Sequence, residues 1–170
     1  MAIYIALLRG INVVGANQLA MKDLAALCGD CGFRKTRTWI QSGNAIFESN
    51  LKEDAIQRRL EKALAAKMNK PIAVMVRTPA EMRAALEGNP FPGKEGSKVA
   101  VLFLAGAPPA EKLDGLTGPG GEQVRTGRRE IYIYYPEGQG RSKFKLPVKE
   151  PGTIRNINTV TKLTELSGGS

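Results

Sequence analysis

The chain has 170 residues and a formal net charge of +9, from 25 Lys and Arg against 16 Asp and Glu. Hydrophobic residues make up 42% of it, as in a soluble globular domain, and no apolar run approaches the ~20 residues that span a bilayer. There is no histidine, which excludes a Ser-His-Asp triad, Cys-His catalysis and a histidine-based zinc site. We expect no membrane partner, no metal, no cofactor and a cytoplasmic location.

Residues 1–88 predict six main elements in the order strand, helix, strand, strand, helix, strand. Residues 2–9 are an apolar run typical of a buried strand, and residues 53–68 carry an apolar stripe at helical spacing. The other predicted elements of this part are a helix at 21–31, strands at 37–40, 45–48 and 72–76, and a short additional helix at 80–86. This order is that of the ferredoxin-like split βαβ unit.

Residues 89–97 are a linker that contains proline and glycine, and after it the order of elements starts again. Residues 98–166 predict strands at 99–104, 122–125, 130–135 and 153–155, and helices at 109–116, after Ser142 and at 159–166. Pro147 and Pro151 limit the helix after Ser142 to about two turns. The predicted fold class is therefore α+β, with two tandem ferredoxin-like (βαββαβ) halves, the second partly degraded, and a disordered tail at 167–170.

Cys28 and Cys31 form a C-x-x-C sequence, a pattern found in redox pairs and in zinc sites. The residues before Cys28 follow the spacing of a helix face, which places the pair at a helix C-terminus, where the dipole disfavours thiolate. A zinc site would need two further Cys or His ligands, which the chain lacks. We expect Cys28 to be a core residue and Cys31 a partly buried thiol near the helix end.

Four short phrases combine glycine or arginine with amide and hydroxyl side chains, at 9–12, 41–44, 140–143 and 155–158. Glycine lets a ligand approach the backbone, arginine recognises anions, and amides hydrogen-bond without titrating. The candidate ligand-binding residues are Arg9, Asn12, Gln41, Ser42, Asn44, Arg141, Ser142, Lys143, Arg155, Asn156 and Asn158. The alternative is that the amides and serines stabilise turns and cap helices, while the arginines form ion pairs.

The phrases also carry a family resemblance. The sequence at 6–13, 40–44, 135–138, 140–143 and 155–163 resembles, in this order, a bacterial family known as a domain of unknown function, number sixteen-ninety-seven. The resemblance covers nearly the full chain, and the cysteine pair is not among the residues that carry it. It implies a pair of ferredoxin-like α+β halves and no established activity.

Residues 121–163 carry nine basic and four acidic side chains, a local charge of +5 that attracts nucleic acid, phosphorylated metabolites or acidic surfaces. The first hypothesis is a binding protein for an anionic ligand, either a small molecule such as a nucleotide or a nucleic acid. The second is an enzyme acting on a phosphorylated or carboxylated metabolite, with Arg9, Arg141 and Arg155 as clamps and either Lys143 or an unidentified carboxylate as general acid or base. The third is a protein-interaction module that uses an exposed sheet edge. The oligomeric state is left open.

Overall fold

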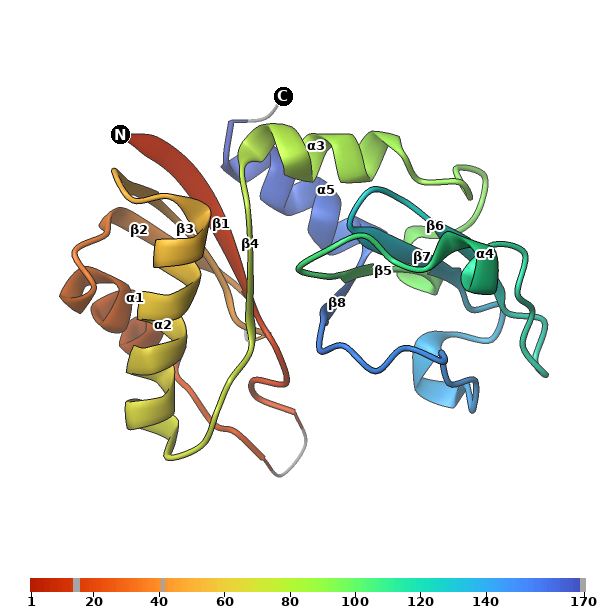
Figure 1. Ribbon diagram of the computed structural model, residues 1–170, viewed down its shortest axis with the longest axis horizontal. Helices are drawn as coiled ribbons and strands as arrows, with labels where there is room; N and C mark the ends of the chain where they lie inside the picture. Colours follow the sequence, from red (N-terminus) through yellow and green to blue (C-terminus); the bar gives the residue numbers. More distant parts are fainter. Residues whose placement is uncertain (14–15, 41, 169–170) are drawn as a thin grey trace. The chain divides into compact units, whose positions relative to one another are not determined.

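The computed structural model describes residues 1–13, 16–40 and 42–168. Within these ranges the protein is an α+β structure with two four-stranded antiparallel sheets and five α-helices (Figure 1). The chain divides into two compact units: unit 1 is Met1–Met82 with Leu163–Ser170, and unit 2 is Arg83–Lys162. No helix in the described ranges is long and apolar enough to cross a membrane.

Unit 1 is built on a sheet with the strand order β2-β3-β1-β4. The four strands are β1 (Ala2–Leu8), β2 (Arg34–Trp39), β3 (Asn44–Ser49) and β4 (Val74–Arg77). The apolar run at the N-terminus forms β1, which pairs antiparallel with both β3 and β4 and so lies inside the sheet. The more polar β2 pairs with β3 at one edge of the sheet.

Two helices, α1 (Met21–Asp30) and α2 (Glu53–Met68), cover one face of this sheet (Figure 1). Their apolar stripes pack on every second residue of the strands, because side chains alternate between the faces of a sheet. The central buried side chains of this core include Ala6, Leu8, Leu24, Phe47, Ile56, Leu60, Leu64, Val74 and Val76. Each fully buried leucine among them contributes about 1.5–3 kcal/mol to stability. Asn69, in the left-handed conformation, ends α2.

Unit 2 is built on a sheet with the order β6-β7-β5-β8. Its strands are β5 (Val99–Phe103), β6 (Gln123–Thr126), β7 (Glu130–Tyr134) and β8 (Thr153–Asn156). The helix expected at 109–116 is the single turn α4 (Ala110–Leu113). Two 3-10 turns occur at Gly96–Lys98 and Gln139–Arg141. The helices α3 (Pro79–Glu87) and α5 (Ile157–Leu166) are each divided between the two units.

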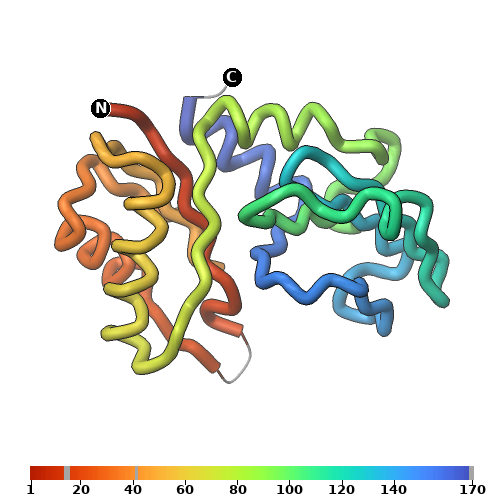
Figure 2. Tube along the Cα trace, in the orientation of Figure 1, coloured from red at the N-terminus to blue at the C-terminus, as the bar shows by residue number. Residues whose placement is uncertain are grey.

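The prediction of a helix after Ser142 was wrong. Residues 142–152 contain no helix, and the trace between the 3-10 turn and β8 runs without a helical coil (Figure 2). Two prolines, Pro147 and Pro151, remove backbone donors that a helix would need. The segment instead packs Phe144, Leu146 and Val148 against the hydrophobic core of unit 2, here called the second core, which consists of Ala100, Leu104, Leu113, Val124, Ile131, Ile133 and Tyr135.

The C-terminal helix and tail also differ from the expectation. α5 starts at Ile157, two residues before the predicted start. Ser167 is buried and its amide donates to the carbonyl of Leu163, and the Gly168 amide donates to Glu165. These two residues therefore continue the hydrogen bonding of α5, while 169–170 lie outside the described residues.

Candidate functional site

The predicted ligand-binding residues divide between the two units. Unit 1 contains Arg9, Asn12, Ser42 and Asn44, and Gln41 lies outside the described residues. Unit 2 contains Arg141, Ser142, Lys143, Arg155, Asn156 and Asn158. Each group is therefore a separate candidate.

In unit 1 the structure brings the two phrases together where β1 ends and β3 begins. The Leu8 amide donates to the Gly43 carbonyl at 2.9 Å, and Leu7 pairs with Asn44 across the strands. Gly43 has a φ of +87°, and a Cβ there would lie 3.1 Å from Leu8 Cβ and 3.3 Å from Ile11 Cβ. Only glycine allows this close approach of the two loops without strain.

The asparagine side chains of these loops form hydrogen bonds with backbone groups. Asn12 donates through Nδ2 to the Leu19 carbonyl and accepts through Oδ1 from the Leu19 amide, both at 2.8 Å. Asn44 is fully buried, and its Nδ2 donates to the Trp39 carbonyl at 2.9 Å and to Ser42 Oγ at 3.1 Å. Turn chemistry therefore accounts for these side chains. Arg9, which follows β1, is exposed.

In unit 2 the phrase at 140–143 is held by a buried glutamate, Glu122, which was not among the predicted site residues. Glu122 accepts from Ser142 Oγ through Oε2 and from the Gly120 amide through Oε1, each at 2.8 Å. Burial alone would raise the pKa of the Glu122 carboxyl, but these hydrogen bonds outweigh it and hold the pKa below its usual value. Ser142 Oγ also accepts from the Phe144 amide at 3.1 Å. Ser142 thus connects residues 142–152, which contain no helix and are here called the extended segment, to the loop before β6.

Two side chains of the phrase at 155–158 also form hydrogen bonds that stabilise the fold. Arg155 is 8% exposed, and its Nη1 donates to the Ile154 carbonyl at 2.8 Å. Burial lowers the pKa of the Arg155 guanidinium to about 10. Asn156 Oδ1 accepts from the Thr159 amide at 2.9 Å, which confirms it as a cap of α5. Asn158, in the first turn of α5, is exposed.

The exposed cations of unit 2 lie along the extended segment. Side-chain exposure alternates from 141 to 149, so the even-numbered residues are half-buried and the odd-numbered ones face solvent. The outward residues include four cations, here called the basic row: Arg141, Lys143, Lys145 and Lys149. Within the described residues none of these four side chains forms an ion pair. Only Arg141 and Lys143 were predicted as ligand-binding residues, although the period-two pattern that also exposes Lys145 and Lys149 is visible in the sequence.

The cysteine pair occupies the position expected of it. Cys28 is fully buried on α1, and Cys31, the C-cap residue of that helix, is buried as well and not only partly so. Both are free thiols. Burial, aided by the nearby Cys31, raises the pKa of Cys28 to about 12, and burial also raises the pKa of Cys31. Among the residues that the structure describes, no cluster of Cys, Asp and Glu could hold a metal ion.

Comparison with known proteins adds the family and the fold. No curated protein matches the chain. The solved structure of a conserved bacterial protein from Streptococcus pneumoniae has a TM-score of 0.78 and 22% sequence identity, and the match covers 99% of each chain. At this identity the likeness concerns the fold alone. The sequence profile of the family described as "Protein of unknown function (DUF1697)" matches residues 1–132. The chain belongs to this family, whose function is unknown.

Proposed function

We propose that the protein binds a polyanion, a single-stranded nucleic acid, through the basic row of unit 2. The observation that supports this is the alternation along 141–149, which exposes Arg141 at the end of a 3-10 turn and Lys143, Lys145 and Lys149 on the segment that follows it. In extended chain, alternate residues lie about 7 Å apart, so Arg141, Lys143 and Lys145 form an evenly spaced line. The chain bends at Pro147, and Lys149 follows the bend at most about 29 Å from Arg141.

The basic row is held in place by its inward neighbours. Phe144, Leu146 and Val148 pack against the second core, and Ser142 is tied to Glu122 by a 2.8 Å hydrogen bond. An ordered backbone means that a ligand need not order the segment when it binds, so less conformational entropy is lost. A row of this length suits an extended chain of phosphates better than one small anion.

The aromatic side chains favour recognition of the phosphate backbone over recognition of bases. Tyr132 is buried and donates through its hydroxyl to the Ala85 carbonyl at 2.6 Å, so its ring is not available for stacking. The Tyr134 ring lies 5.9 Å from that of Phe91, with Lys94 Nζ 5.1 Å from its centroid. Binding through charge alone carries little sequence preference and depends strongly on salt.

The test compares two variants that lose the same four positive charges. R141Q/K143Q/K145Q/K149Q removes the basic row, and R58Q/K62Q/K67Q/K70Q removes four exposed cations from α2 and the residues that follow it. Fluorescence anisotropy with labelled oligo(dT) and oligo(U) at low salt should show a loss of affinity of at least tenfold for the first variant only. Equal losses in both variants would mean a general charge effect, and no binding by the wild type would refute the proposal.

We also infer that the chain consists of two ferredoxin-like halves, at 1–88 and 98–166, joined by the linker at 89–97, and that each half supplies the sheet of one unit. The first half has the element order β1-α1-β2-β3-α2-β4, and both sheets place their first and third strands in the centre. In the second half, the segment at 142–152 stands where the second helix would be, and Phe144, Leu146 and Val148 provide its apolar contacts.

A cytoplasmic location, which the sequence predicts, is supported by the free thiols of Cys28 and Cys31.

A further inference from the structure

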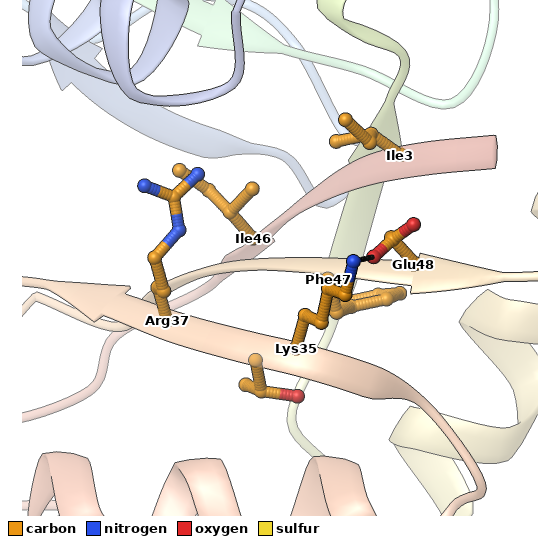
Figure 3. Close-up of a pocket in the computed structure, with 7 residues that line it drawn as sticks. Ile3, Lys35, Arg37, Ile46, Phe47 and Glu48 are labelled. Carbon is orange, nitrogen blue, oxygen red and sulfur yellow. Dashed lines mark ion pairs between the residues drawn. The ribbon is translucent and has the colours of Figure 1, made fainter. Parts of the chain in front are cut away.

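A hollow of about 530 Å³ opens beside the edge strand of unit 1 (Figure 3). Its lining is Ile3, Lys35, Thr36, Arg37, Ile46, Phe47 and Glu48. The volume falls within the range of about 300–1,000 Å³ that is usual for small-molecule sites. None of these residues belongs to the basic row, so the hollow is a separate candidate site.

The apolar and charged side chains of the hollow share one face of the sheet. Ile3 pairs with Glu48 and Arg37 pairs with Ile46, and residues that are directly opposite in antiparallel strands project to the same side. This is the face away from α1 and α2, since Ala45 and Phe47 belong to the core beneath those helices. Ile3 is 38% exposed although its side chain is large and apolar.

The backbone of β2 is irregular at this hollow. The register between β2 and β3 shifts between Arg34 and Arg37, which marks a bulge. Lys35, inside the bulge, has a φ of +52°, a left-handed conformation that is rare for lysine. Bulges re-aim side chains and are frequent at binding sites, and strained backbone persists where it serves a function. At this irregularity the Lys35 side chain points toward Glu48 on β3 (Figure 3).

The charges at the hollow favour an anion. Lys35 Nζ lies 3.4 Å from Glu48 Oε2, and the Lys35 side chain is 83% exposed, so this pair is weak and easily exchanged. Arg37 Nη2 donates to the carbonyl of Leu166, at the end of α5 in the same unit. Arg34 lines an adjoining hollow together with Lys35 and Glu48. Three cations, Arg34, Lys35 and Arg37, therefore lie within four residues of β2, and one of them, Lys35, forms an ion pair with Glu48.

We propose that this hollow binds a small carboxylate with an apolar body. The body lies on the exposed Ile3, with the buried Ile46 at the base of the hollow, and the carboxylate takes the Lys35 ammonium from Glu48. Arg37 contributes positive charge at the other side of Ile46 (Figure 3). A neutral molecule of the same shape gains the apolar contacts alone and binds more weakly, because a charge-assisted hydrogen bond is about twice as strong as a neutral one.

The test follows the methyl NMR signals of Ile3 and Ile46 during titration with octanoate, and with octanol as the neutral counterpart. Both signals should shift and saturate with octanoate. K35M, which nearly keeps the length of the side chain, should weaken octanoate binding about tenfold. This corresponds to a loss of roughly 1.4 kcal/mol in binding free energy. K62M, at an exposed position on α2, should leave it unchanged. No saturable shift, equal affinity for octanol, or equal losses in K35M and K62M would overturn the proposal.

Two further variants separate this site from folding and from the basic row. Ile3→Trp fills the hollow from an exposed position and should abolish the octanoate response without lowering Tm. R141Q/K143Q/K145Q/K149Q should leave the octanoate titration unchanged. Octanoate binding that survives Ile3→Trp would contradict the assignment of the site, and octanoate binding lost in the quadruple variant would place the carboxylate on unit 2 instead.

Discussion

Ser142 donates a hydrogen bond of 2.8 Å to Glu122, which lies 20 residues earlier in the chain. A Cβ at Gly118 would lie 2.3 Å from Glu122 Oε1, and one at Gly120 would lie 2.7 Å from Oε2, so two glycines make room for the carboxylate. The hydrogen bond joins the loop before β6 to the start of the extended segment that carries the basic row.

Ser142→Ala should therefore weaken polyanion binding although all four cations remain. The freed segment must be ordered when the ligand binds, which adds an entropic cost. Anisotropy titrations should show a lower affinity with the salt dependence of the wild type, because the number of phosphate contacts is unchanged. Serine at 97, which is exposed, provides the control: Ser97→Ala should bind as the wild type does. Unchanged affinity in Ser142→Ala would show that the segment holds its shape without this bond.

The Glu122 carboxyl predicts a loss of stability in acid. Its folded pKa is below the ordinary value of 4.5, so its contribution is present above that value and is lost as pH falls through the folded pKa. Glu122→Gln removes the titrating group, and its Tm should fall less than that of the wild type between neutral pH and pH below 4.5. Thermal melts across this range measure the difference. Parallel pH profiles would contradict the role given to Glu122.

Gly43→Ala should destabilise the protein by about 1–3 kcal/mol, since it forces a side chain into a positive-φ position. The new Cβ would also press on Leu8 and Ile11. Gly93→Ala is the matched control, because nothing lies within 4 Å of a Cβ at that exposed position. Urea denaturation should give a lower midpoint for the first variant and no lower one for the second. Equal midpoints would mean that the loops at 9–12 and 42–44 can separate at no cost.

Arg155→Ala should lower the free energy of unfolding by more than about 2 kcal/mol, because the change removes a buried, hydrogen-bonded side chain. Arg125 provides the comparison, since its Nη1 donates to the Val124 carbonyl at 2.8 Å in the same way, but the residue is exposed. Arg125→Ala should change stability by less than about 0.5 kcal/mol. A stable Arg155→Ala protein would instead favour the role of Arg155 as a ligand clamp.

The cysteines should resist alkylation in the native protein. With a pKa of about 12, the Cys28 thiolate at pH 8 is roughly a thousandfold scarcer than for a thiol at the ordinary value of 9.0. Iodoacetamide labelling followed by mass spectrometry should be slow without urea and fast in it. Rapid native labelling of Cys28 would show that α1 opens readily.

Strong local patterns predicted most of the fold. The apolar run at the N-terminus became the buried strand β1, and the helical stripe over 53–68 matched α2. The prediction for the segment after Ser142 was wrong because the glycine-rich start of this segment suggested a helix. The alternation of Phe144, Leu146 and Val148 with Lys143 and Lys145 has the period of an extended chain. The structure follows this period-two pattern and not the helix that the phrase at 140–143 suggested.

The candidate site was harder to predict than the fold. The role of Asn12 depends on Leu19, and that of Ser142 on Glu122, and such partners are fixed by the path of the chain in three dimensions. The hollow at β2 depends on a bulge at Lys35 that no local pattern announced. Residue type indicated hydrogen bonding and anion affinity, but only the contacts show which side chains are already engaged.

The most direct test of polyanion binding by the basic row is the salt dependence of oligo(dT) affinity. For single strands, log K falls with log salt by about 0.7 per phosphate contact, so loss of four contacts should flatten the slope by roughly 3. We expect this change for R141Q/K143Q/K145Q/K149Q and an unchanged slope for R58Q/K62Q/K67Q/K70Q. Equal slopes for the wild type and the basic-row variant would contradict it.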